Sequence, residues 1–136
     1  MIKIFYLFGI IDRIIFDDNR TIIIDYKTDD ITESEIESRA SKYLPQLKFY
    51  AYIIQRLLKN RFEIKGKVIF IKHPDKPVLF EYDSISDRTV DSGIQYMISS
   101  IRSNNYSVNM ESCKDCLFAD ENKRCIIIGS EIIKSA

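Results

Sequence analysis

Hydrophobic residues are concentrated in four short runs that are separated by polar turn residues. The first two runs are rich in Ile and Phe and enclose a polar cluster at residues 17–20, and the last two enclose a segment with two prolines at residues 73–77. Apolar runs that are bounded by turn residues are typical of β-strands. We therefore predict strands over residues 5–16, 21–27, 67–72 and 78–82.

A different spacing of apolar residues predicts helices between and after these strands. Residues 45–59 and 86–103 carry apolar side chains at the i, i+3, i+4 spacing of a helix with one buried face, and Ser86 is the expected N-cap of the second. A capping-box pattern at residues 32–35 predicts a short helix in the polar segment 33–43. The order is β-β-α-β-β-α, followed by an irregular lobe. The positions expected to face inward are Leu47, Tyr50, Ala51, Ile54, Leu57 and Leu58 in the first helix and Val90, Ile94, Met97, Ile98 and Ile101 in the second.

The first two strands each carry an aspartate among apolar residues. If the turn between the strands has two residues, Asp17 pairs with Arg20. On that register Asp12 lies directly opposite Asp25, with Cβ atoms roughly 4.5–5.5 Å apart. Lys27 falls on the same face as Asp25, because strand side chains alternate with a period of two. A register slip of one residue would instead send Asp12 to the other face.

Composition and charge place few restrictions on function. The chain has 136 residues, 46% hydrophobic and 29% charged, and its 20 basic and 20 acidic residues give a formal net charge of +0. This length suits one domain with a core of its own. The neutral balance gives no argument for nucleic acid binding by bulk charge, although a local patch is possible because basic residues crowd the middle of the chain. They are Lys42, Lys48, Arg56, Lys59, Arg61, Lys65, Lys67 and Lys72.

Two further counts bear on where the chain works. No apolar run approaches the ~20 residues that a membrane span needs, so we expect no membrane partner. Residues 1–11 are apolar but lack a small-residue cleavage site, so we interpret them as part of a strand and not as a signal peptide. Three cysteines, an odd number, argue against a disulfide framework and fit a reducing cytoplasm.

The two aspartates and the lysine form the candidate chemistry. Like charges facing each other destabilise a hairpin unless something neutralises them, and Mg²⁺ prefers carboxylate oxygens. A metal held there would polarise a phosphodiester and lower the pKa of a bound water, which Lys27 would orient or activate. The alternative is a hairpin whose acids simply face solvent. Because D-x-K is short, the spacing alone favours neither interpretation.

Three motifs together resemble a known family. They are GIIDR at residues 9–13, IDYKT at residues 24–28 and YLPQLKFYA at residues 43–51. Over about residues 5–82 the chain looks like the RecB-type nucleases of the PD-(D/E)XK superfamily, most of all the nuclease domains of AddA and AddB recombination helicase-nucleases. The resemblance implies an α/β fold of restriction-endonuclease type, a mixed central sheet flanked by helices.

The resemblance also implies roles for residues of the site. Asp12 and Asp25 match metal ligands for Mg²⁺ or Mn²⁺, and the backbone carbonyl of Tyr26 lies where the family often adds a further ligand. Lys27 matches the catalytic lysine.

Gln46 and Tyr50 match the family's Q-x-x-x-Y signature, which contacts DNA or supports the lysine. The i, i+4 spacing puts both side chains on one helix face. Without the other motifs, ordinary helix surface and core would explain them.

One part of the family pattern is absent from this sequence. The family has a helix before the first strand that carries a His or Glu ligand, and this chain begins too late to hold it. We expect a fold that lacks this helix, from the C-terminal part of a larger protein or from a truncated or decayed gene product. His73, the only histidine, lies in a Pro-rich turn and is not expected to be a ligand. Apolar surface exposed by the missing helix predicts self-association, and whether the isolated chain is active stays open.

The cysteines fit either of two interpretations. Cys113, Cys116 and Cys125 give the spacing C-x₂-C-x₈-C, one thiolate short of a usual zinc or iron–sulfur site. Some relatives hold a [4Fe–4S] cluster with three C-terminal cysteines and one far upstream, although they usually space the last pair more tightly. The site is then a cluster or Zn²⁺ centre completed in the full-length protein, or the three are free thiols.

The resemblance implies a metal-dependent deoxyribonuclease of exonuclease type that binds DNA and works with a helicase domain or subunit in DNA recombination and repair. We expect a nuclease core at residues 1–105 and a cysteine-bearing segment with a tail at residues 106–136. The alternative function is a catalytically inactive DNA-binding or protein-docking module with the nuclease fold.

Overall fold

The chain divides into two units, Met1–Met97 and Ile98–Ala136. The computed structural model describes residues 5–17, 19–59, 63–105, 116–117 and 119. Within these residues, no helix combines the length and the apolar character that a bilayer crossing requires.

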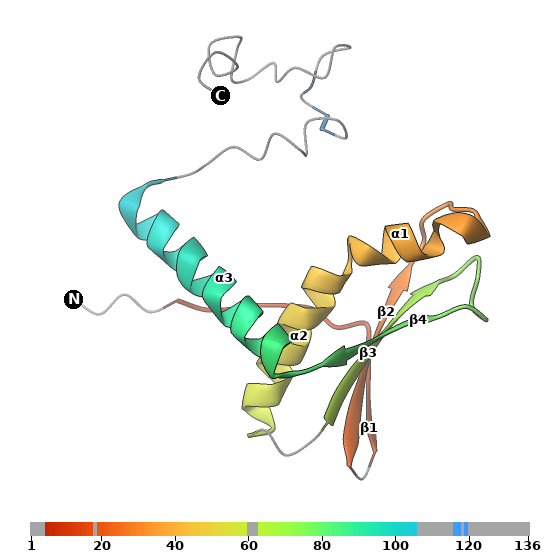
Figure 1. The fold of residues 1–136 in the computed structure, drawn as a ribbon, viewed down its shortest axis with the longest axis horizontal. Helices are drawn as coiled ribbons and strands as arrows, with labels where there is room; N and C mark the ends of the chain where they lie inside the picture. Colours follow the sequence, from red (N-terminus) through yellow and green to blue (C-terminus); the bar gives the residue numbers. More distant parts are fainter. Residues whose placement is uncertain (1–4, 18, 60–62, 106–115, 118, 120–136) are drawn as a thin grey trace. The chain divides into compact units, whose positions relative to one another are not determined.

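The first regular elements of the described chain are β1 (Arg13–Asp17) and β2 (Arg20–Lys27), which form the antiparallel hairpin seen in Figure 1. Asp17 faces Arg20 across it, so the predicted register is confirmed.

The strand predicted over residues 5–16 is wrong in its first part, because residues 5–11 have no regular secondary structure. Continuing the register would pair Tyr26 with Ile11. Instead, the carboxylate of Asp12 accepts the hydrogen bond from the backbone N–H of Tyr26, at 2.9 Å. The Asp12 side chain thus occupies the Tyr26 N–H that would otherwise bond to the backbone of a longer β1. The strand therefore begins only at Arg13.

The sheet is completed by β3 (Glu63–Phe70) and β4 (Val78–Tyr82), in the order β1-β2-β3-β4. β2 pairs with β3 in parallel and β3 with β4 antiparallel, which makes the sheet mixed as predicted. β4 has the predicted bounds. The strand predicted over residues 67–72 begins earlier, at Glu63, and ends at Phe70, because the chain turns there and His73 N–H donates to the Phe70 carbonyl at 2.9 Å.

The helices follow the predicted order. The polar segment contains a 3₁₀ turn, η1 (Glu33–Glu35), and α1 (Ile36–Ser41), and the Thr32 N–H donates to the Glu35 carboxylate at 2.8 Å. This is the capping bond that the sequence predicts. The main helix, α2 (Leu44–Leu57), has Pro45 in its first turn and packs against β2, β3 and β4.

The last helix, α3 (Ser84–Ser103), begins earlier than predicted. Ser86 is not its cap but a buried residue inside the first turn. The Asp83 carboxylate takes the capping role, because it accepts a hydrogen bond from the Ser86 N–H at 2.7 Å. In the second unit the helix ends at Ser103, and Asn104 follows in the left-handed region with φ 51°.

The core of the first unit lies between the sheet, α1 and α2. Three residues expected to face inward are exposed instead, namely Leu57 at 71%, Met97 at 47% and Ile101 at 42%. Helical periodicity identifies an apolar face but not what packs on it, and Leu57 is the last residue of its helix. The central buried residues are Ile31, Ile36, Ala40, Leu47, Val68 and Phe70.

Candidate active site

The end of β2 places Asp25 and Lys27 on the face of the sheet that α2 covers. Asp25 is only 3% exposed, beside Val68 of β3. Its Oδ2 lies 2.7 Å from Nζ of Lys27, an ion pair whose two side chains are 5% and 16% exposed. A buried carboxylate of this kind needs compensation, and the lysine supplies part of it.

The first turns of α2 bring two more predicted residues to this ion pair. Lys27 Nζ donates to Gln46 Oε1 at 3.2 Å, and Gln46 Nε2 donates to the Tyr50 hydroxyl oxygen at 2.6 Å. The i, i+4 spacing brings the Gln46 amide to Tyr50 on one helix face, and the contact with Lys27 joins α2 to β2. The four side chains therefore form one polar chain from Asp25 to Tyr50.

Asp12 directly precedes β1 and lies next to the segment that carries Asp25 and Lys27. Its Oδ2 is tied to the N–H of Tyr26, the residue between Asp25 and Lys27. Burial raises the pKa of Asp25, Lys27 opposes this effect, and the charge of Asp12 adds to the rise. The two aspartates are thus close enough to repel each other, although Asp12 lies just before the paired strand.

The donor set fits a divalent cation in its chemistry. Asp25 Oδ2 is buried and has Lys27 Nζ beside it at 2.7 Å, and a carboxylate oxygen has a second lone pair that a cation could use. Two neighbouring acids are what Mg²⁺ commonly takes from a protein, with water and substrate phosphate completing its shell. Among the described residues, no group of three His, Cys, Asp or Glu side chains is placed to bind a metal ion.

Sequence reasoning missed two contacts of this site. The ring of Tyr43 lies under Lys27, with Nζ 4.2 Å from the ring centroid. The backbone of Gly9 passes so close to Tyr50 that a Cβ there would lie 2.7 Å from the ring carbon Cε1. Gly9 and Tyr43 each begin one of the three sequence motifs, so the sequence marked both positions. Their contacts join segments that are distant in sequence, and local patterns do not predict such contacts.

The other candidate ligands lie apart from this cluster or cannot be placed. His73 Nε2 is 2.9 Å from the backbone carbonyl oxygen of Ile31. Cys116 is exposed, whereas Cys113 and Cys125 lie outside the described residues. The predicted cluster or zinc site therefore stays a prediction.

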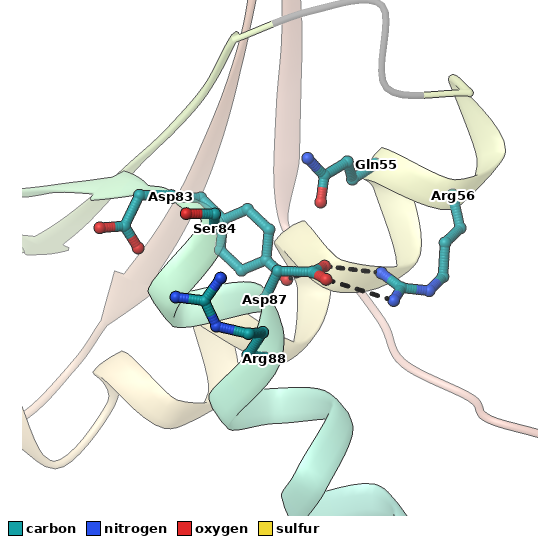
Figure 2. A pocket seen from close by; sticks show the side chains of 7 residues that line it. Gln55, Arg56, Asp83, Ser84, Asp87 and Arg88 are labelled. Carbon is teal, nitrogen blue, oxygen red and sulfur yellow. Dashed lines mark hydrogen bonds and ion pairs between the residues drawn. The ribbon is translucent and has the colours of Figure 1, made fainter.

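A pocket of about 460 Å³ lies at the other end of α2 (Figure 2). There Arg56 Nη1 and Nη2 approach the Asp87 carboxylate at 2.8 and 3.5 Å, and Tyr82 donates to the same carboxylate at 2.9 Å. The guanidinium also stacks on Tyr52, 3.3 Å from the ring centroid. These contacts join α2 to α3 and β4, which indicates a structural role.

Comparison with known proteins agrees with this geometry. The sequence model of the PD-(D/E)XK nuclease superfamily matches residues 3–120. An ATP-dependent helicase/nuclease subunit from Clostridioides difficile (strain 630) is 36% identical over 72 residues, which cover 53% of this chain and 6% of that protein. No solved structure matches the chain significantly.

Proposed function

This chain belongs to the PD-(D/E)XK nuclease superfamily, and we propose that it is a metal-dependent DNA nuclease domain that hydrolyses phosphodiester bonds. The observation that carries the proposal is the buried Asp25–Lys27 ion pair, 2.7 Å long, with Asp12 beside it. An acid and a lysine held together at the end of a strand, out of bulk water, are suited to activating a water molecule next to a phosphate.

We propose that Asp12, Asp25 and the backbone carbonyl of Tyr26 hold Mg²⁺ or Mn²⁺. The bound ion would polarise the phosphodiester and favour ionisation of a water molecule. A nearby cation favours the charged form of a carboxyl, so it would oppose the effect of burial on the pKa of Asp25. The proximity of Asp12 to the buried carboxylate of Asp25 supports this assignment, because two neighbouring acids repel each other unless a cation lies between them.

Lys27 is the proposed group that orients the attacking water. In the hydrolysis, the water oxygen bonds to phosphorus and one P–O ester bond breaks. The attacking water loses a proton to solvent, and the departing ester oxygen takes up a proton from solvent. Gln46 supports the lysine through the 3.2 Å bond to Nζ, and Tyr50 holds Gln46. Both are therefore proposed as part of the catalytic site, with contact to DNA as a further role.

The proposed role beside a helicase rests only on the similarity to the Clostridioides difficile protein. That protein is named a helicase/nuclease subunit, and the chain matches only 6% of its length. We propose that the domain acts as an exonuclease beside a helicase domain or subunit in DNA recombination and repair. Binding of a [4Fe–4S] cluster or Zn²⁺ by the cysteines and self-association of the isolated chain stay predictions.

The test is cleavage of labelled DNA by the full-length protein with Mg²⁺ or Mn²⁺. Asp25→Ala and Lys27→Ala should each lower the rate by about 100-fold or more, the usual scale for loss of a catalytic acid–base group. A matched control uses the exposed ion pair of Lys65 and Glu81, 3.2 Å apart in the same sheet. Lys65→Ala and Glu81→Ala should cleave normally. Cleavage that survives both site substitutions would contradict the proposal.

A non-catalytic DNA-binding or docking module is the second candidate. It is favoured by the absence of a third acidic or histidine ligand among the described residues. Calorimetric titration with Mn²⁺ separates the two candidates. Binding that disappears in Asp12→Asn and Asp25→Asn supports the enzyme, and no binding by the unaltered protein supports the module.

A further inference from the structure

We propose that Tyr43 is a positioning residue for Lys27, whose ammonium group rests on the face of the Tyr43 ring and is held there between Asp25 and Gln46. This inference rests on the proposed function insofar as Lys27 is the catalytic lysine. The contact itself can be tested without any nuclease reaction.

The geometry of the contact is that of a cation–π interaction. Lys27 Nζ lies 4.2 Å from the ring centroid, inside the limit of about 6 Å for such pairs. The lysine side chain is only 16% exposed, and cation–π attraction is stronger where water is excluded. The ring, the carboxylate of Asp25 and the amide of Gln46 thus provide three contacts for one ammonium group.

The ring is itself fixed from two sides. The Tyr43 hydroxyl donates to Oδ1 and Oδ2 of Asp29, both at 2.9 Å, and Arg39 Nε lies 3.6 Å from Oδ1. The ring packs against Phe70 of the core at a centroid distance of 6.4 Å. Burial and the bonded carboxylate raise the pKa of Tyr43, which keeps the hydroxyl a donor. The ring therefore has little freedom to move away from the lysine.

Such a support is needed because a lysine is long and flexible. Its four-carbon stem allows many rotamers, and an ammonium group has no preferred direction of its own. The Asp25 carboxylate and the Gln46 amide each bind Nζ of Lys27, and the Tyr43 ring contacts the ammonium group on a third side. Because small misplacements of a catalytic group are costly, the ring should affect the chemical step more than substrate binding.

The chain provides a matched control in α2, the helix that Tyr43 directly precedes. Tyr52 also carries a cation over its ring, Arg56 at 3.3 Å, and its hydroxyl donates to Asp91 at 2.6 Å. The arrangement repeats that of Tyr43 but lies near the last turns of α2, away from Lys27. Substitutions at Tyr52 therefore report what loss of a ring and a hydroxyl does to α2 and its contact with α3, without a change at Lys27.

The kinetic arm compares two substitutions at each tyrosine. Tyr43→Leu removes the ring and should lower kcat by about tenfold or more with little change in KM, as expected for a misplaced catalytic group. Tyr43→Phe keeps the ring and should stay within about threefold of the unaltered protein, because only the hydroxyl anchor is lost. Tyr52→Leu and Tyr52→Phe should leave kcat unchanged. All are assayed well below their melting temperatures.

The second arm is spectroscopic and does not depend on activity. Protons above an aromatic face are shifted upfield, so the Lys27 Cε methylene protons should have unusually low chemical shifts in NMR spectra of the full chain. The shift should vanish in Tyr43→Leu and persist in Tyr43→Phe and Tyr52→Leu.

The two arms separate the possible failures. An absent upfield shift in the unaltered chain would overturn the contact. A shift lost in Tyr43→Leu together with an unchanged kcat would overturn the positioning role and leave the nuclease proposal intact. A folded, metal-bound protein that shows the shift but cleaves no DNA would overturn the proposed function and leave the contact established.

Discussion

At the scale of single residues, the burial of Asp25 has opposing consequences for function and for stability. Its burial is what makes it useful as a proposed ligand, and the same burial disfavours its charge. The net direction is a raised pKa, with burial as the largest cause and Lys27 only partly offsetting it. Functional groups commonly reduce stability in this way, because selection maintains activity at the expense of stability.

The pH dependence of stability should reveal this effect. Because the pKa of Asp25 is raised in the folded state, the protonated carboxyl contributes stability below its ordinary pKa of 3.8, and this contribution is lost as pH rises through the folded value. Asp25→Asn should therefore be more stable than the unaltered chain at pH 7, because the amide carries no charge that burial would disfavour.

Urea denaturation without metal, between pH 3 and pH 7, measures the difference. The two free energies of unfolding should converge near pH 3. A less stable Asn variant at pH 7 would mean that the ion pair with Lys27 outweighs the cost of burial.

At the scale of elements, the pairing of β3 with β4 depends on one glycine. Gly66 lies opposite Phe80, and a Cβ at Gly66 would lie only 1.6 Å from the ring carbon Cε1 of Phe80. The ring occupies the space where a side chain would otherwise stand. Apart from its own helix backbone and chain neighbours, Gly93 in α3 has no described atom within 4 Å of the corresponding position. The two glycines thus offer very different surroundings to the same substitution.

Alanine at these positions should have opposite effects. Gly66→Ala forces Phe80 out of its place and should cost about 1–3 kcal/mol, as overpacking does. Gly93→Ala removes backbone freedom in a helix and should gain about 0.5–1 kcal/mol. Chemical denaturation of both variants measures the changes. A neutral Gly66→Ala would show that the ring can swing aside at little cost.

At the scale of the whole molecule, the first unit contains everything that the proposal needs. The sheet, the core cluster and the side chains around Lys27 all lie within Met1–Met97. The predicted boundary after residue 105 keeps all of α3. The segment beyond it contributes nothing to these contacts among the described residues.

A chain that ends at residue 105 should therefore fold by itself. We expect one cooperative transition, with a melting temperature within a few degrees of that of the full chain, since about 1 kcal/mol moves the midpoint of a domain of this size by roughly 4–8 °C. Calorimetry of both chains provides the comparison. A loss of cooperativity on truncation would show that the C-terminal segment belongs to the folding unit.

Much of this arrangement could be predicted from local patterns. Hairpin arithmetic gives the register of β1 and β2, the period of two puts Asp25 and Lys27 on one face, and the i, i+4 spacing joins Gln46 to Tyr50. The start of β1 could not be predicted, because it depends on a side chain that captures a backbone donor. The cation–π contact between Lys27 and Tyr43 joins two segments that are distant in sequence, and no local pattern encodes that contact.

The parallel pairing of β2 with β3 has a consequence for the time course of folding. The hairpin joins neighbours in sequence, whereas α1 and α2 separate β2 from β3 along the chain. Contacts that close long loops form late, because the entropy of closure is lost before they repay it. We therefore expect the strand with both Asp25 and Lys27 to pair with β1 earlier than with β3. A chain emerging from the ribosome would therefore complete the hairpin before β3 was available to cover Asp25.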